Sequence, residues 1–151
     1  MTIGAQIADM ASLWPDFRLT GPEGATASWQ GPVRPLLQTF VVEITYRAPL
    51  IIEQFKVRIL QPKVRVLSPP LRRRPADPEG HLPHVYYTPN GDVTLCMLDP
   101  DADDWSPFDS LAHTTVPWTI EWLAAYEGWR ATGQWTAVSY THLTLPTIYS
   151  V

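Results

Sequence analysis

Hydrophobic and polar residues alternate along much of the first half of the chain, and a period of two residues predicts β-strands. Residues 38–48 (QTFVVEITYRA) place four apolar side chains on one face, Phe40, Val42, Ile44 and Tyr46. Residues 53–60 (EQFKVRIL) alternate in the same way, and shorter strands are predicted at 26–31 and 63–67. Because short links join these four strands in succession, we expect an antiparallel meander.

Two segments instead show the spacing of a helix. Residues 3–14 carry apolar side chains three and four residues apart, and Pro15 ends the run, because the residue before a proline avoids the α region. The predicted apolar face consists of Ile3, Ile7, Met10, Ala11 and Trp14. A second helix is predicted from Val116 to a stop at Gly133, with an aromatic stripe at Trp118, Trp122, Tyr126 and Trp129. Such a stripe is typical of a core face, so we expect this helix to pack on the sheet.

The segment between the strands and the second helix is predicted to be irregular. Residues 68–83 hold five prolines and three consecutive arginines, which favours a solvated surface loop over a phosphate-binding patch. The stretch that follows contains the single cysteine, Cys96. The predicted fold is therefore α+β: an N-terminal helix, a four-stranded antiparallel meander, an irregular loop with Cys96, and a C-terminal helix packed on the sheet.

Composition and charge argue against several classes of protein. A chain of 151 residues is the size of one domain, and a formal net charge of −4 does not indicate a nucleic-acid-binding surface. One cysteine cannot form an internal disulfide. The sequence shows neither a signal-peptide pattern nor a run of 18 apolar residues. We expect a monomeric, cytoplasmic protein that binds neither nucleic acid nor a membrane.

The last 14 residues, 138–151, differ in composition from the rest of the chain. They contain no Asp, Glu, Lys or Arg, and VSYTHLTLPT resembles a conceptual translation of a transposase-type sequencing adapter. We interpret them as a tail of laboratory origin and residues 1–137 as the domain. A native β-rich tail is the alternative, because Val, Ile, Thr and Tyr favour strands.

Cys96 is the residue on which the function depends. A cysteine outside a disulfide is commonly a buried apolar residue, which is the default interpretation. A zinc site is not expected, because the chain has no second cysteine. The acidic stretch DPDADD begins like a calcium loop, but Asp104 and Ser110 occupy the positions where an EF-hand needs Gly and Glu. No metal is therefore predicted.

The same aspartates bear on the reactivity of Cys96. Four of them lie between positions 99 and 104, and negative neighbours disfavour a thiolate. Such a thiol is a weak self-activated nucleophile, and its surroundings do not match a papain-type motif. It can still accept an acyl group that arrives already activated as a thioester.

Several stretches, taken in order, resemble the ubiquitin-conjugating enzymes. Residues 31–69 resemble that family's Gly-Pro turn, two central strands and Pro-Lys-Val-Arg strand. TPNGDVTLCML resembles the segment that reads His-Pro-Asn and then Ile-Cys-Leu, and Trp105-Ser106-Pro107 stands where the family has Trp-Ser-Pro. TVPWTIEWLAAYEGWRATGQW is similar to a narrower group, the bacterial conjugating enzymes of CBASS-type antiphage defence operons.

The resemblance implies a transferase in bacterial antiviral defence. In that group a cysteine thioester carries the C-terminus of a ubiquitin-like protein or of a cyclic-oligonucleotide synthase, and passes it to an amine on a target. The implied partners are the acyl donor, the amine-bearing target and an activating enzyme that is separate or absent, since this chain has no P-loop. No cofactor is implied. The alternatives are a non-catalytic binding module and a redox-sensing cysteine, which the acidic loop disfavours.

The resemblance also assigns candidate site residues. Cys96 matches the thioester cysteine, and Asn90 stands near the asparagine that steadies the oxyanion. Thr88 replaces the family's histidine, however, and Asn90 could instead begin an Asn-Gly turn. His84 is the alternative polar partner. Substrate-binding residues are predicted at Asp99, Asp101 and Asp103, which would attract a lysine ammonium; the alternative is a solvated acidic loop.

Overall fold

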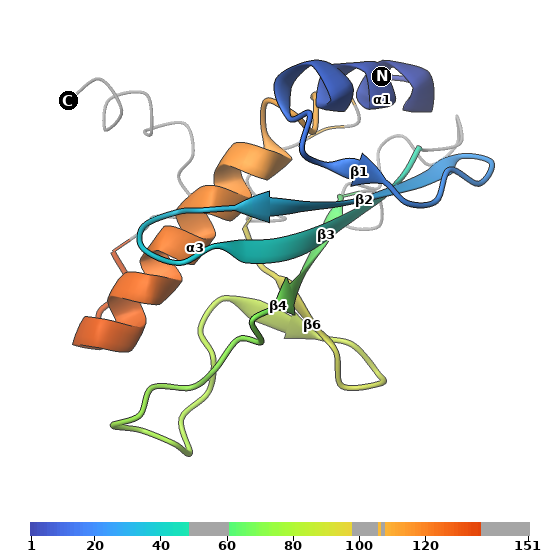
Figure 1. The fold of residues 1–151 in the computed structure, drawn as a ribbon. Coiled ribbons are helices and arrows are strands. Elements are labelled where there is room, and N and C mark those ends of the chain that lie inside the picture. Colours follow the sequence, from blue (N-terminus) through green and yellow to red (C-terminus); the bar gives the residue numbers. More distant parts are fainter. Residues whose placement is uncertain (49–60, 98–105, 107, 137–151) are drawn as a thin grey trace.

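A computed structural model describes residues 1–48, 61–97, 106 and 108–136 of the protein (Figure 1). The elements follow in the order α1 (Ile3–Leu13), β1 (Arg18–Leu19), β2 (Thr26–Val33), β3 (Phe40–Arg47), β4 (Lys63–Ser68), β5 (Val85–Tyr87), β6 (Val93–Leu95) and α3 (Thr115–Thr132). The fold is α+β, with a helix at each end of the sheet-forming region, and this confirms the predicted class.

The main sheet has four antiparallel strands in the order β1-β2-β3-β4. Its first member, β1, was not predicted, and the strand predicted at 53–60 lies outside the described residues. A second sheet consists of the hairpin β5-β6, and β6 lies beside β4. Part of the segment predicted to be irregular is therefore an ordered hairpin that ends next to Cys96.

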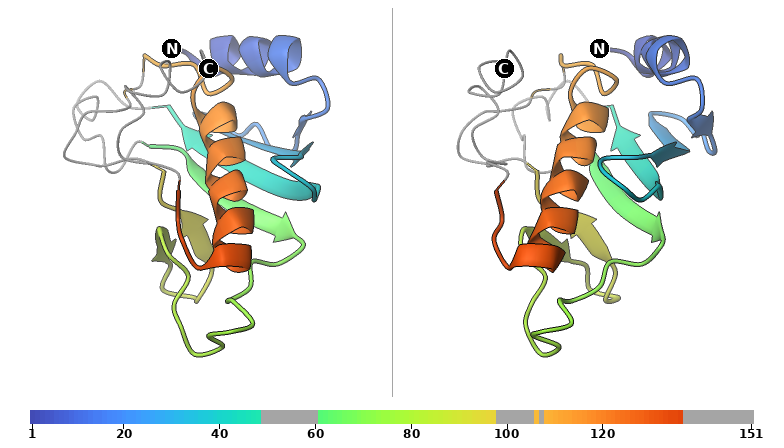
Figure 2. Two further views of the ribbon diagram at one scale, coloured as in Figure 1. Left: turned by 90° about the vertical axis from the view of Figure 1, so that its left-hand side faces the viewer. Right: turned by 60° about the vertical axis from the view of Figure 1, so that its left-hand side comes forward.

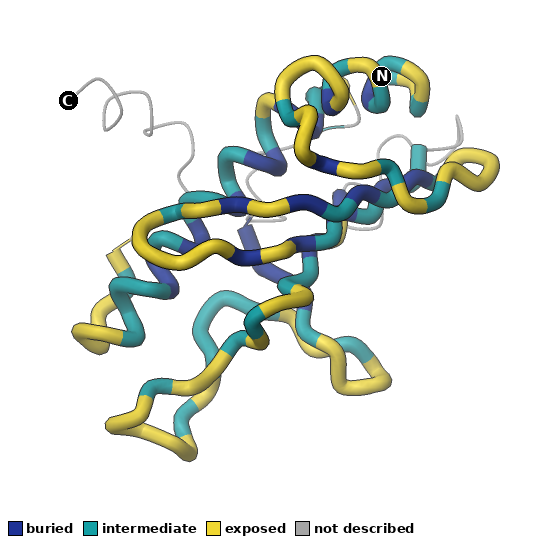
Figure 3. The backbone as a smooth tube through the Cα atoms, viewed as in Figure 1, coloured by how far each residue is buried: buried dark blue, intermediate teal, exposed yellow. Residues whose placement is uncertain are grey.

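The central strands β2 and β3 bury every second residue, as their alternating pattern predicted (Figure 3). Trp29 lies opposite Ile44 in the antiparallel register. β2 continues through Pro32, beyond the predicted stop at Gly31. This is possible because β1 pairs only with Trp29 and Gln30, so Pro32 lies beyond that pairing and is not required to donate a hydrogen bond toward β1.

The N-terminal helix α1 differs from its prediction in the residues that it buries. Its cap is Thr2, whose hydroxyl accepts a hydrogen bond from the amide of Ala5 at 3.1 Å. Met10 is buried and Ile7 packs against the core, but Ala11 of the predicted apolar face is exposed. The polar side chain of Gln6 is fully buried instead.

The C-terminal helix α3 covers one face of the main sheet (Figure 2). Trp122 and Tyr126 of the predicted aromatic stripe are buried, while Trp118 and Trp129 pack at the edge of the core. The helix ends at Gly133, as predicted, with a left-handed φ of 84° and an amide that donates to the carbonyl of Trp129 at 2.7 Å.

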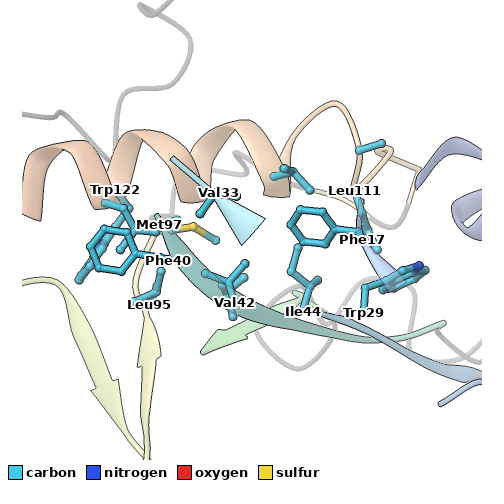
Figure 4. Close-up of a cluster of buried hydrophobic side chains, with 14 of the residues drawn as sticks. Phe17, Trp29, Val33, Phe40, Val42, Ile44, Leu95, Met97, Leu111 and Trp122 are labelled. Atoms are coloured by element: carbon cyan, nitrogen blue, oxygen red, sulfur yellow. The ribbon is translucent and has the colours of Figure 1, made fainter. Parts of the chain in front are cut away.

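The core lies between the buried face of the sheet, α3 and the strand that leads to Cys96. Figure 4 shows Leu95 and Met97, the two sequence neighbours of Cys96, pointing into this core beside Phe40 and Trp122. The hydroxyl of Thr119 on α3 donates to the sulfur of Met97 at 3.4 Å. Within the described part of the chain, no helix has the length and apolar character needed to cross a bilayer.

Candidate functional site

Cys96 directly follows β6 and continues its pairing with the neighbouring strand. The backbone N–H of Cys96 donates to the carbonyl of His84 at 2.9 Å. This bond extends the β5-β6 ladder one step beyond the pair of Val85 and Leu95. His84 and Cys96 therefore lie opposite each other on adjacent strands. The side chain of Cys96 is buried, with an exposure of 5% for the residue.

The backbone of His84 is held by α3. Its carbonyl accepts a second hydrogen bond from the indole nitrogen of Trp122 at 3.0 Å. The His84 ring packs against the Trp135 ring with centroids 4.9 Å apart, and Trp135 in turn contacts Trp122 with centroids 5.1 Å apart. His84 also adopts a left-handed φ of 53°, which is uncommon outside glycine. The aromatic side chains thus hold the strand that pairs with Cys96.

Burial lowers the pKa of His84 from its ordinary value. Because an unfolded histidine titrates near about 6.5, the folded imidazole is neutral at pH 7. A neutral imidazole carries one N–H donor and one nitrogen lone pair. His84 can therefore donate a hydrogen bond without carrying a positive charge.

The lowered pKa of His84 predicts how stability depends on pH. Below about pH 6.5 the unfolded chain binds a proton at this histidine more readily than the folded protein does, so stability falls with pH in that window. We expect His84→Asn to weaken this fall, and asparagine tolerates the left-handed backbone. The measurement is the thermal midpoint from pH 8 to pH 5. A slope in His84→Asn equal to that of wild type would contradict the assignment.

Asn90 lies in the turn of the hairpin, not beside Cys96. The amide of Gly91 donates to the carbonyl of Thr88 at 2.9 Å, and the amide of Thr88 donates to the carbonyl of Asp92 at 2.8 Å. The side-chain oxygen of Asn90 accepts from the Asp92 amide at 3.3 Å and from the Thr88 hydroxyl. β6 separates Asn90 from Cys96, and its three residues extend over about 10 Å. The role of Asn90 at an oxyanion stays a prediction.

Gly91 gives this hairpin its shape, because its φ of 90° is one that other residues rarely adopt. A β-carbon at Gly91 would meet no atom within 4 Å, so the effect of Gly91→Ala is one of backbone strain alone. We expect a loss of about 1–2 kcal/mol in the free energy of unfolding, measured with denaturant. The control is Gly21→Ala, which has the same open space and no left-handed φ. Equal effects of the two substitutions would contradict this account.

A cavity of about 440 Å³ opens between β4 and the hairpin. This volume lies within the range of roughly 300–1,000 Å³ that is usual for ligand sites. Its walls include Leu95 and Met97 on either side of Cys96 in the sequence, together with Lys63, Tyr86 and Thr94. Lys63 is exposed and forms no ion pair with any residue that the structure describes. The cavity therefore reaches the two sequence neighbours of Cys96 and has a positive charge in its wall, and Cys96 is not among its described lining residues.

The hairpin turn is also tied to the main sheet by charge. Arg65 of β4 contacts Glu43 of β3 at 3.2 Å and Asp92 of the turn at 3.0 Å. These side chains are partly exposed, and such pairs contribute only about 0–1 kcal/mol each. Their main effect is to fix the position of the turn relative to β4.

The predicted substrate-binding residues Asp99, Asp101 and Asp103 lie outside the described residues, as does Trp105. Across the described ranges, His, Cys, Asp and Glu side chains form no group of three or more that could hold a metal ion. Sequence reasoning named His84 but missed that its backbone pairs with Cys96. A hairpin centred on Asn90 would have revealed it, because antiparallel pairing about that residue brings 88 opposite 92 and 84 opposite 96.

Comparison with known families gives one match. A family model described as "Type II CBASS E2 protein" matches residues 6–142, a span that includes His84, Asn90 and Cys96. None of the curated proteins matches the chain.

Proposed function

The chain belongs to the Type II CBASS E2 family, and from this premise we propose that Cys96 carries an acyl group as a thioester and passes it to an amine. Membership makes the protein an E2-like component of a bacterial antiphage defence system that acts with other CBASS components. The acyl group in the proposal is the C-terminus of a cyclic-oligonucleotide synthase or of a ubiquitin-like protein. The observation that carries the proposal is Cys96 itself, the single cysteine, located inside the matched region.

The reaction proceeds in two balanced steps. The sulfur of Cys96 attacks the carbonyl carbon of an activated donor, a new C–S bond forms, and the donor's own thiol leaves with the proton. The nitrogen of an amine then attacks the Cys96 thioester, a C–N bond forms, and Cys96 is released as a thiol. The donor carboxyl is activated by a separate enzyme, or the donor is supplied already as a thioester.

Each step passes through a tetrahedral intermediate whose oxygen needs a hydrogen-bond donor. The amide of Cys96 is committed to the His84 carbonyl at 2.9 Å in this structure. His84, whose backbone pairs with Cys96 from the opposite strand, is the donor that we propose, through its neutral imidazole. Asn90 remains a predicted second donor, and the predicted attraction of a lysine ammonium by Asp99, Asp101 and Asp103 is part of the same proposal.

The cavity between β4 and the hairpin supports a place for the end of the donor chain. Leu95 and Met97 line it, so it reaches the residues directly before and after Cys96 in the sequence. Lys63 contributes a positive charge, which complements the carbonyl oxygens of an extended peptide. We infer that the residues just before the donor's terminal carboxyl lie in this cavity.

The burial of Cys96 favours one alternative, a non-catalytic binding module. A thiol in a residue that is 5% exposed must become accessible before it can attack a carbonyl. If it does not, the protein would bind its CBASS partners through the same fold without forming a covalent bond.

A non-reducing gel distinguishes the two functions. The protein is incubated with the neighbouring synthase, with or without a candidate activating enzyme and ATP. We expect a band at the summed mass that disappears when a thiol reductant is added. Co-elution of the two proteins on size exclusion without any such band would support the binding module and overturn the thioester proposal.

A further inference from the structure

One polar side chain of α1 is buried against a distant part of the chain. Gln6 has no exposed surface. Its side-chain nitrogen donates to the carbonyl of Asp109 at 2.9 Å, and its side-chain oxygen accepts from the amide of Leu111 at 2.9 Å. Both ends of the amide are satisfied, as burial requires. Gln6 therefore holds the backbone of a segment that is 103 positions away in sequence.

Two further hydrogen bonds link α1 and the residue after it to the same segment. The carboxylate of Asp9 accepts from the hydroxyl of Ser110 at 2.6 Å, and the indole nitrogen of Trp14 donates to the carbonyl of Ala112 at 2.8 Å. We call residues 109–112 the anchored segment. Gln6, Asp9 and Trp14 make four hydrogen bonds to the anchored segment, and three of the four involve the backbone of that segment. These bonds fix the path of the chain at residues 109–112.

The anchored segment lies between Cys96 and α3 in the sequence. Toward α3, the carbonyl of Leu111 accepts from the amide of Val116 at 3.1 Å, and Leu111 is fully buried in the core. Toward Cys96, the carboxylate of Asp109 accepts from the amide of Ser106 at 2.8 Å. At the other end, Met97 is held in the core by Thr119. The chain that follows Cys96 is thus fixed at Met97 and again at the anchored segment.

We propose that Gln6 is a positioning residue for acyl transfer at Cys96. It acts through the anchored segment: by holding the backbone of Asp109 and Leu111, it positions the start of α3, and Thr119 of α3 holds Met97 next to Cys96. This inference rests on the proposed thioester function of Cys96. It adds a residue on α1 that touches neither the thiol nor the donor.

The test uses Gln6→Glu, which has nearly the same shape. The carboxylate form can accept from the Leu111 amide but lacks a proton for the Asp109 carbonyl, whereas the protonated form restores both bonds. Burial raises the pKa of an introduced carboxyl, so acidification reverses the defect. Asp9 on α1 and Asp109 and His113 on the facing side also titrate, and wild type measured at each pH corrects for them.

Two rates of Cys96 are measured at pH 8 and pH 6 in the full chain. One is acylation by a peptide with the synthase's C-terminal sequence, supplied as a mercaptoethanesulfonate thioester. The other is alkylation by iodoacetamide, which requires no acyl transfer. At pH 8 we expect Gln6→Glu to be acylated about tenfold more slowly than wild type, which is the effect of one lost buried hydrogen bond. At pH 6 we expect the two acylation rates to be nearly equal.

A core variant separates positioning from general stability. Val33→Ala creates a cavity in β2, away from the anchored segment, and lowers the thermal midpoint without a titrating group. If both variants slow acylation equally at both pH values, Gln6 is only structural and the inference is overturned. If wild type is alkylated but never acylated, the thioester proposal fails by itself. In that case the alkylation rates decide. If the rate of Gln6→Glu relative to wild type changes between pH 8 and pH 6, Gln6 positions the Cys96 thiol. If that relative rate is the same at both pH values, this role is overturned too.

Discussion

Cys96→Ser is expected to trap the acylated protein as an oxygen ester that survives thiol reductants. The serine oxygen can still accept the acyl group, but an alkoxide is a poorer leaving group than a thiolate, so transfer to an amine slows. Cys96→Ala removes the nucleophile altogether, and we expect turnover to fall by at least about 10³-fold. The measurement is the band at the summed mass on gels run with and without reductant.

Both substitutions at Cys96 should leave the fold intact, because serine and alanine are close to cysteine in volume. A thermal midpoint measured for each variant verifies this. His113→Asn, at an exposed position, serves as the matched control and should load like wild type. A band at the summed mass that persists in Cys96→Ala would show that the acyl group is carried elsewhere.

Trp122→Ala should produce the largest loss of stability. Trp122 is 1% exposed, lies among the core residues and donates to the carbonyl of His84 at 3.0 Å. Truncating a buried tryptophan costs roughly 3–5 kcal/mol through the lost contacts and the cavity left behind. The substitution also frees the backbone of His84 that pairs with Cys96. Denaturant unfolding measures the change in the free energy of unfolding.

Two variants identify the source of the Trp122 effect. Trp122→Phe keeps most of the apolar contact and loses only the indole N–H, so we expect a loss of about 1–2 kcal/mol. Trp118→Ala, on the same helix at the edge of the core, should cost less than Trp122→Ala. A loss below about 1 kcal/mol in Trp122→Ala would contradict the position given to this side chain.

The strands and helices of the main layers could be predicted because their patterns are local. Alternation across Phe40, Val42, Ile44 and Tyr46 identified β3 and its buried face, and the aromatic stripe identified α3. Two errors arose where the deciding contact was not local. The stop predicted at Gly31 ignored that Pro32 lies beyond the pairing with β1, and Ala11 was placed on the buried face of α1 instead of Gln6.

The candidate site was only partly predictable for the same reason. The motif around Cys96 named the thiol, and His84 was the alternative polar partner. The sequence did not reveal that His84 and Trp122 together hold the Cys96 backbone. Gln6 was an unremarked polar residue, because its partners at Asp109 and Leu111 are known only once the chain has folded. The sequence left open whether Asn90 takes part in catalysis or begins a turn. The hydrogen bonds of Thr88 and Gly91 show that it lies in a turn, and its catalytic role stays a prediction.

The most direct test of the central claim is mass spectrometry of the loaded protein after digestion at acidic pH. The full chain is incubated with the peptide thioester or the activated synthase, and the peptide that contains Cys96 is sequenced. We predict an added mass equal to the donor's acyl group on the sulfur of Cys96, removed by hydroxylamine. An unmodified Cys96 peptide, with the added mass on a lysine or on no residue, would contradict the assignment of Cys96 as the acyl carrier.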